Sequence, residues 1–270
     1  MELYCKPSAS GEVGDCPFAH AVAMALVLRQ VPFDFVPTAR EAKPQWLLEK
    51  HDGSMPCLRM SRTENGAGAD ATDSGTIMSV SDSRAILEYV DAHLGAREEE
   101  RGSLSAGGAA AALVDRVALF SAFARYCKNT DGAKDTDLRE NLNAALSRLE
   151  DALPTTAAAD AAADTAADAA ADAAADAADA ASDASADPFA LGSTRATLAD
   201  CLLGPTLLHM HATLGALKGV PLASLLEPFP KAEAYCRHML QSMQCTPLVH
   251  SCRYSEADVL LGWRQARGEV

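Results

Sequence analysis

The first 94 residues alternate short apolar runs of strand length with helical segments, and this alternation restricts the fold more than any other feature of the sequence. Glu2–Lys6 and Val31–Thr38 have the length and composition of strands, and Pro17–Gln30 between them has helical length and an apolar stripe. This order predicts a βαβ unit, which is typical of α/β domains. The same patterns predict a helix at 44–50, strands at 56–60 and 76–80, and a helix at 82–94.

Beyond residue 108 every periodic segment has the period of a helix. These segments are Ala109–Lys128, Asp137–Leu153, Leu198–Lys218 and Ala232–Gln244. We therefore predict an α/β domain at 1–94, a linker at 95–108 that is charged and then rich in Gly and Ser, and an all-α domain at 109–270. A polar stretch at 61–75, rich in Gly and Asp, is expected to be a hairpin insertion in the first domain.

Residues 156–187 form a low-complexity insertion in the helical domain, composed almost entirely of Ala and Asp. Its eight Asp residues account for more than half of the net charge of −14. This composition is compatible with a conditional helix or with disorder. Ala favours a helix, but Asp at four-residue intervals places like charges on one helix face. The insertion also has no large apolar side chain whose burial would offset the entropy lost on ordering. The acidity belongs to this insertion, and no cluster of Lys and Arg predicts a nucleic-acid partner.

The eight cysteines are expected to be reduced thiols rather than disulfides. The start Met1–Lys6 lacks a basic and apolar leader, and the chain is too long for a disulfide scaffold, so we expect a cytoplasmic protein. No run of eighteen uninterrupted apolar residues predicts a membrane span. The cysteines lack the spacing of a zinc site, and no metal is expected.

The segment Gly14-Asp15-Cys16-Pro17-Phe18 places a cysteine between the first strand and the first helix. The unpaired N–H groups and the dipole of a helix N-terminus stabilise a thiolate, and such sites bring the pKa from about 8.5 to roughly 3.5–7.5. A Cys-x-x-Cys motif would have its second thiol at Ala19, so reduction is expected to need an external thiol such as glutathione. A buried structural cysteine is the alternative.

Four segments occur in the order that they have in the glutathione-transferase fold. They are Gly14-Asp15-Cys16-Pro17-Phe18, Lys43-Pro44-Gln45-Trp46-Leu47, Met55-Pro56 and Asp82-Ser83-Arg84-Ala85-Ile86. The chain thus resembles the glutathione-transferase superfamily, which has a thioredoxin-like α/β domain followed by an all-α domain, and the second segment resembles dehydroascorbate reductases. In the helical domain Thr197–Asp200 resembles the superfamily's capping box, and Gly262-Trp263 resembles the tail of the reductases.

The resemblance implies a role for each matched position. Cys16 would be the catalytic nucleophile, with Lys6 and Asp15 beside it where dehydroascorbate binds. The positions that would hold glutathione are Lys43, Met55, Pro56, Asp82 and Ser83. Their ammonium and hydroxyl groups suit the carboxylates of glutathione, and a carboxylate suits its amine. The implied reaction is thiolate attack on dehydroascorbate, release of ascorbate and reduction of the oxidised cysteine by glutathione. Glutathione would be the only cofactor, and the protein is expected to be a monomer.

The chain departs from the family's usual Cys-Pro-Phe-Ser-Gln-Arg at Ala19, His20 and Ala21. A hydroxyl and a basic side chain are lost near the site, so reduced or altered turnover is expected. We expect His20 to lie at the surface.

Two other functions remain open. An omega-like glutathione transferase acting as a thioltransferase would use Cys16 without depending on Lys6 and Asp15. A chloride-intracellular-channel-like protein able to insert into membranes would fit Ala196–Cys201 and the acidic insertion. The segment at Lys43–Trp46 and the Gly262-Trp263 pair favour the reductase over the channel-like protein.

Overall fold

The computed structural model describes residues 1–270 except 9–10, 62–76, 95–102, 155–188, 193–194 and 246–254. The chain forms two compact units, Met1–Gly102 with Thr246–Val270, and Ser103–Cys245. Apart from Ser61, the predicted insertions at 61–75 and 156–187 lie outside the described residues, as does the first part of the predicted linker.

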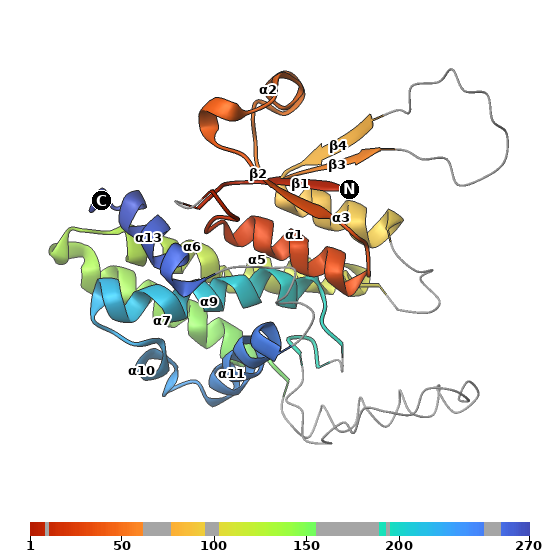
Figure 1. The fold of residues 1–270 in the computed structure, drawn as a ribbon. Helices are drawn as coiled ribbons and strands as arrows, with labels where there is room; N and C mark the ends of the chain where they lie inside the picture. The colour runs from red at the N-terminus through yellow and green to blue at the C-terminus, as the bar shows by residue number, and fades with distance from the viewer. Residues whose placement is uncertain (9–10, 62–76, 95–102, 155–188, 193–194, 246–254) are drawn as a thin grey trace, which may run out of the picture. The chain divides into compact units, whose positions relative to one another are not determined.

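A mixed four-stranded sheet forms the centre of the first unit (Figure 1). Its strands are β1 (Glu2–Cys5), β2 (Asp34–Pro37), β3 (Cys57–Ser61) and β4 (Ile77–Ser81), in the order β2-β1-β3-β4. The strand β1 is parallel to β2 and antiparallel to β3, which is antiparallel to β4. This is the thioredoxin-like arrangement that the sequence predicted.

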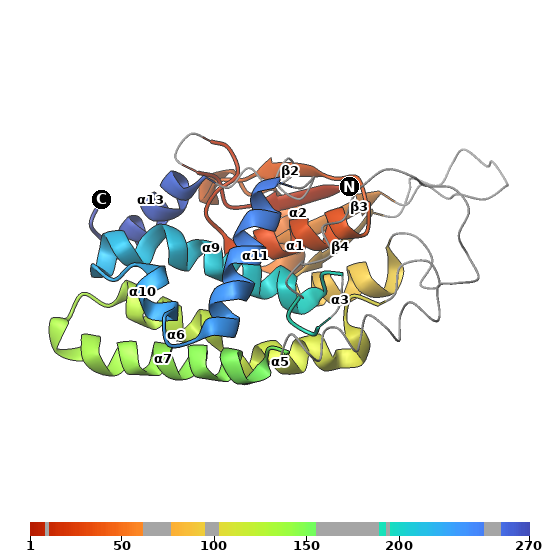
Figure 2. The ribbon, with the colours of Figure 1, turned by 90° about the horizontal axis from the view of Figure 1, so that it is seen from below.

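Helices cover both faces of this sheet. The helices α1 (Pro17–Leu28) and α3 (Ser83–His93) pack against each other on one face, and α2 (Gln45–His51) lies on the other, as Figures 1 and 2 show. Alternation along β1 supplies both cores, because Cys5 packs with residues of the α1 side while Tyr4 packs with Leu47 of α2. A short 3-10 helix, η1 (Arg40–Ala42), precedes α2, and α13 (Glu256–Ala266) also belongs to this unit.

The second unit is helical, as predicted. Its elements are η2 (Ala106–Gly108), α5 (Ala109–Val117), α6 (Leu119–Lys128), η3 (Gly132–Lys134), α7 (Asp135–Ala152), α9 (Leu198–Lys218), α10 (Leu222–Leu226) and α11 (Pro230–Cys245). The long helix α9 is central, since it contacts α5, α6, α10 and α11. Fully buried leucines of α7, together with Phe123 of α6, fill much of the core.

Three boundaries differ from those that the sequence predicted. The single helix expected at Ala109–Lys128 is divided at Ala118, which has a left-handed backbone with φ 50°. The end of the predicted linker is part of the helical unit, because Leu104 is buried and its carbonyl accepts a hydrogen bond from the Leu198 N–H over 2.9 Å. The segment containing α13, expected in the helical domain, groups with the first unit.

One stretch, Ala106–Lys128, has the length and apolar composition of a helix that could cross a membrane. The left-handed backbone of Ala118 divides it into α5 and α6, and Leu113, Phe123 and Tyr126 are buried in the core of the unit. A single stretch of this kind is weak evidence for a membrane span.

The carboxylate of Asp200 organises the start of α9. Its side chain is fully buried and forms the predicted capping box with Thr197, whose backbone N–H donates to Asp200 Oδ2 over 2.7 Å. The other oxygen accepts from the Ala190 N–H and from the Tyr235 hydroxyl, both over 2.9 Å. Burial and then the Asp200 charge raise the pKa of Tyr235, so this phenol stays a donor. One carboxylate thus joins α9, α11 and the segment that precedes α9.

We predict that Asp200→Ala destabilises the protein by at least about 3 kcal/mol, because each buried donor left without an acceptor costs about 1–3 kcal/mol. The matched control is Asp258→Ala at the start of α13, where Asp258 Oδ2 accepts a hydrogen bond from the exposed Ser255 hydroxyl over 2.7 Å. That change should cost only ~1 kcal/mol, as is usual for a single hydrogen bond that solvent can replace. Chemical denaturation followed by circular dichroism measures both, and equal losses would contradict the role assigned to Asp200.

Candidate active site

The register of the sheet brings the predicted site residues to one end of it. Tyr4 of β1 lies opposite Cys57, and Cys57 lies opposite Ser81 of β4. The end of β1, the start of β3 and the end of β4 are therefore neighbours. The segments that leave the sheet at this end carry Lys6, Asp15 and Cys16 after β1, Met55 and Pro56 before β3, and Asp82 and Ser83 after β4.

The loop between β1 and α1 closes on itself and places Lys6 beside Asp15. The Gly14 N–H donates to the Lys6 carbonyl over 2.8 Å, and Pro7 bridges to Val13. A Cβ atom on Gly14 would lie 2.5 Å from that carbonyl oxygen, so the crossing requires glycine. Lys6 Nζ then donates to Asp15 Oδ1 over 2.6 Å, with the lysine side chain 48% exposed and the aspartate 14% exposed.

Cys16 is the N-cap residue of α1, followed by Pro17 at the first helical position, as the sequence predicted. The expected lowering of its pKa is not what the structure gives. Burial raises the pKa of the Cys16 thiol above its ordinary value, and the charge of Asp15 adds to this effect. The N–H groups of Ala19 and Phe18 and the ammonium of Lys6 lower the pKa but do not outweigh burial.

A second thiol, which the sequence did not single out, belongs to the same small core. Cys5 on β1 is 1% exposed and forms a cluster with Val13 and Ala19, against which Cys16 packs. Burial and then the charge of Cys16 raise the pKa of Cys5 to about 12, so it is a thiol at neutral pH. Alternation along β1 was the available signal, because it places Cys5 on the same face as the buried Leu3.

The positions expected to hold the peptide of glutathione are next to one another. Lys43 Nζ donates to the carbonyl of Gly53 over 2.7 Å, two residues before Met55, and the Met55-Pro56 peptide bond is cis. A Cβ atom on Gly53 would lie 3.2 Å from the Lys43 side chain, and its φ is +69°. The positive φ favours glycine at this turn, and Lys43 holds the turn through the Gly53 carbonyl.

Asp82 caps α3 and presents Ser83 at the first helical position. One oxygen, Oδ1, accepts from the backbone N–H groups of Arg84 and Ala85 over 3.0 and 3.2 Å. Its φ of 74° is unusual for a residue other than glycine. Such backbone conformations gather at binding sites, where the surrounding structure maintains them. The second oxygen, Oδ2, makes no hydrogen bond to a residue that the structure describes, so it can accept from an ammonium group.

His51, which the sequence analysis passed over, fastens α2 to the edge of the sheet. Its two ring nitrogens lie 2.8 Å from the Ser79 hydroxyl and 2.9 Å from the Ser81 hydroxyl, both on β4. Since Ser81 directly precedes Asp82, this histidine fixes the end of α2 relative to the turn that carries Asp82. No local signal in the sequence reveals this contact, because the partners lie 28 and 30 residues apart.

The helix α13 approaches Asp15 at Gly262. A Cβ atom at this position would overlap the Asp15 carboxylate, while the neighbouring Trp263 is 5% exposed. The Gly262-Trp263 pair, noted in the sequence as a resemblance, therefore has a steric reason. Only glycine leaves room for the carboxylate that binds Lys6.

The expectation that His20 lies at the surface is wrong, since it is 3% exposed. Residues Ala19–Leu26 of α1 are all buried, and position 20 lies inside with them. Among the residues that the structure describes, no group of three His, Cys, Asp or Glu side chains could hold a metal ion.

Comparison with known proteins supports this architecture. Residues 15–93 match the family described as glutathione S-transferase, N-terminal domain, so the part of the chain with Cys16, Lys43, Met55 and Asp82 has that domain. No curated protein sequence matches the chain.

Solved structures share the fold over almost the whole chain. Dehydroascorbate reductase of Chlamydomonas reinhardtii is 21% identical with a TM-score of 0.59, over 98% of this chain and 97% of that protein. Glutathione transferase Omega 1C of Trametes versicolor is 16% identical with a TM-score of 0.62, over 99% and 96%. The trimeric glutathione transferase TDR1 of Leishmania is 16% identical with a TM-score of 0.60, over 99% of this chain and 48% of that protein. At these identities the likeness shows the glutathione-transferase fold.

We predict that Asp15→Asn lowers the pKa of Cys16 and raises its alkylation rate at pH 7 severalfold. The substitution removes a charge that raises this pKa and frees the Lys6 ammonium, which lowers it. The pH dependence of iodoacetamide modification, read at the Cys16 peptide by mass spectrometry, gives the pKa directly. Asp34→Asn, at the exposed opposite end of the sheet, is the control and should change nothing. A raised pKa in Asp15→Asn would refute this electrostatic account.

Proposed function

We propose that this protein reduces dehydroascorbate to ascorbate with glutathione, through Cys16 as a monothiol nucleophile. The fold and the N-terminal domain support a glutathione-related function. The finer assignment rests on one observation, the pair of Lys6 and Asp15 next to Cys16 at the end of the sheet. A cation and a carboxylate beside a thiol can form charge-assisted hydrogen bonds with a small substrate that has many oxygen atoms. An apolar electrophile would offer them no such bonds.

The proposed reaction has three steps. The Cys16 thiolate adds to a carbonyl carbon of dehydroascorbate, and negative charge develops on the carbonyl oxygen. A first glutathione thiolate attacks the Cys16 sulfur, the carbon–sulfur bond breaks with its electron pair going to ascorbate, and a mixed disulfide of Cys16 with glutathione remains. A second glutathione thiolate attacks its glutathione sulfur, releasing oxidised glutathione and the Cys16 thiolate.

The residues of the site divide this work. Lys6 would stabilise the oxyanion, because its exposed ammonium can contact a substrate oxygen while Asp15 holds it in position. Lys43, Met55, Asp82 and Ser83 would bind the two glutathione molecules in turn at the neighbouring edge. Because the pKa of Cys16 is raised, the thiolate is a minor species at neutral pH, and the rate should increase with pH through the neutral range.

A thioltransferase of the omega kind is the second candidate, since omega-class structures share the fold to the same degree. It would use the same thiol against a mixed disulfide, where charge develops on a leaving sulfur. The contribution of Lys6 distinguishes the two functions. Only in the dehydroascorbate reaction does negative charge develop on the oxygen bonded to the attacked carbon, where an ammonium group would stabilise it.

We predict that Cys16→Ser abolishes glutathione-dependent reduction of dehydroascorbate, because a serine hydroxyl supplies almost no anion near neutral pH. The coupled assay with dehydroascorbate and glutathione measures the loss. Cys236→Ala, which removes a buried thiol of the helical unit, should keep the activity. Retention of most activity in Cys16→Ser would exclude this thiol as the nucleophile.

We predict that Lys6→Ala lowers kcat/KM for dehydroascorbate by roughly tenfold or more, in line with the loss of one electrostatic donor, and lowers disulfide exchange less. Both reactions are measured on one variant, together with the pKa of Cys16 from alkylation. Lys50→Ala, an exposed lysine of α2, is the control. Equal losses in both reactions would remove Lys6 from substrate recognition and favour the omega-like thioltransferase.

A further inference from the structure

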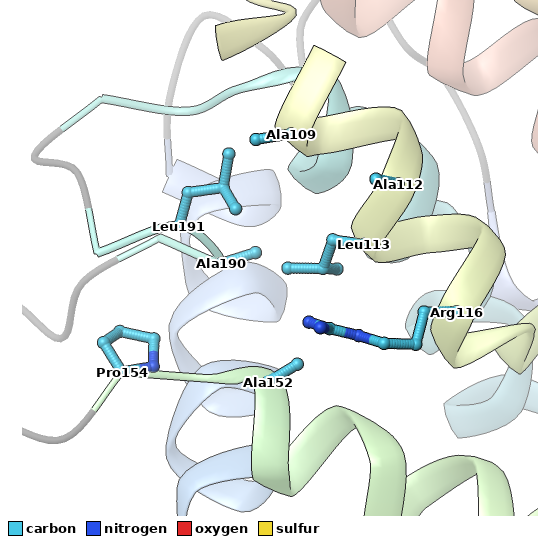
Figure 3. Close-up of a pocket in the computed structure, with 8 residues that line it drawn as sticks. All are labelled: Ala109, Ala112, Leu113, Arg116, Ala152, Pro154, Ala190 and Leu191. Carbon is cyan, nitrogen blue, oxygen red and sulfur yellow. The ribbon is translucent and has the colours of Figure 1, made fainter. Parts of the chain in front are cut away.

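The helical unit contains a hollow that takes no part in the proposed reaction. It lies between α5, the end of α7 and the segment that precedes α9, as Figure 3 shows. Alanines form half of its lining, and the Arg116 side chain extends into it. All of its lining residues belong to the second unit, whereas Cys16, Lys43 and Asp82 belong to the first. The segments of the candidate site are joined to one another within the first unit instead.

The imidazole of His51 joins the end of α2 to the strand that leads into Asp82. Its Nε2 lies 2.8 Å from the Ser79 hydroxyl, and its Nδ1 lies 2.9 Å from the Ser81 hydroxyl. A hydroxyl can donate or accept, so a neutral imidazole makes both hydrogen bonds, with one nitrogen donating and the other accepting. The two serines are two positions apart on β4 and therefore lie on one face of the sheet. Both ring nitrogens thus hold α2 against the end of β4, next to Asp82.

The backbone of His51 is also the start of the turn that leads into Met55. Its carbonyl accepts a hydrogen bond from the Ser54 N–H over 2.8 Å. Within the same turn the Gly53 carbonyl accepts from Lys43 Nζ over 2.7 Å. An ammonium group has three donors, so this contact leaves two for a ligand. The position of His51 therefore also sets the positions of the Lys43 ammonium and the Met55 backbone.

Glutathione would engage both of these regions at once. Its γ-glutamyl amine and its glycine carboxylate lie at opposite ends of the tripeptide. In the proposed function Asp82 accepts from the amine, and Lys43 donates to a carboxylate at the other end. A ligand bound at both ends needs the two protein groups at one separation, because any freedom between them must be lost on binding.

We propose that His51 is a positioning residue that sets the separation of Asp82 and Lys43, and so makes the site selective for glutathione over the dipeptide γ-glutamylcysteine. The tripeptide engages both groups and benefits from their fixed separation, whereas the dipeptide lacks the glycine carboxylate and engages only the Asp82 end. This inference rests on the glutathione site of the proposed function. It does not depend on dehydroascorbate as the electrophile.

Two ligands without a free thiol test the proposal on the full-length protein. S-methylglutathione represents the tripeptide, γ-glutamyl-S-methylcysteine represents the dipeptide, and titration calorimetry measures the binding of each without turnover. His51→Ala should weaken binding of the tripeptide by about tenfold and leave that of the dipeptide nearly unchanged. The matched control is His93→Ala, which removes an exposed histidine at the last position of α3 and should alter neither.

A second variant tests the same contact with the sequence of α2 intact. Ser81→Ala removes one partner hydroxyl and should weaken the tripeptide in the same direction. Added to His51→Ala it should have no further effect, because the two residues form one contact. The pH dependence of Cys16 alkylation should stay the same in each variant, which separates a positioning role from a general disruption of this end of the sheet.

The role of His51 is overturned if His51→Ala weakens both ligands equally, if His93→Ala causes the same loss, or if Ser81→Ala has no effect on the tripeptide. Failure of the unaltered protein to bind S-methylglutathione would remove the glutathione site and this role with it. Binding without any reduction of dehydroascorbate would overturn only the proposed reaction.

Discussion

The pairing of β1 with β3, and of β3 with β4, is the constraint on which the candidate site depends. With Tyr4 opposite Cys57 and Cys57 opposite Ser81, three chain segments far apart in the sequence leave the sheet at the same end. A shift of one residue would turn Cys5 away from the α1 core and move Asp82 away from Met55. Because both faces of the sheet are covered, by α1 and α3 on one side and α2 on the other, such a shift would expose apolar side chains on both.

The pKa of Cys16 is set by effects that oppose one another. The helix N-terminus offers N–H donors, and Lys6 offers a positive charge, yet burial against Val13 and Ala19 outweighs them. The ion pair makes Lys6 less effective, since Asp15 neutralises much of its field and adds a negative charge of its own. The site thus has a positioned thiol and a positioned cation rather than a permanent thiolate. A thiol of raised pKa is less often ionised but is the stronger nucleophile once ionised.

Glycines recur around this site for two physical reasons. Gly14 lies against the Lys6 carbonyl and Gly262 lies against the Asp15 carboxylate, at approaches that leave no room for a Cβ atom. Gly53, whose carbonyl accepts from Lys43, has a positive φ of +69°. In the helical unit, small residues have the opposite effect, because the alanines around Arg116 leave a hollow instead of closing a contact.

The sequence by itself determined the class of the fold, the order of its elements and the position of Cys16 at a helix start, because hydrophobic period and the Cys-Pro pair act over a few residues. The capping box of Thr197 and Asp200 could also be predicted from the sequence, since the two residues are three positions apart. Only the tertiary structure decided the direction of the Cys16 pKa, the burial of His20, and the placing of Gly262 on Asp15. These depend on desolvation and on contacts between segments distant in the chain, which no local pattern encodes.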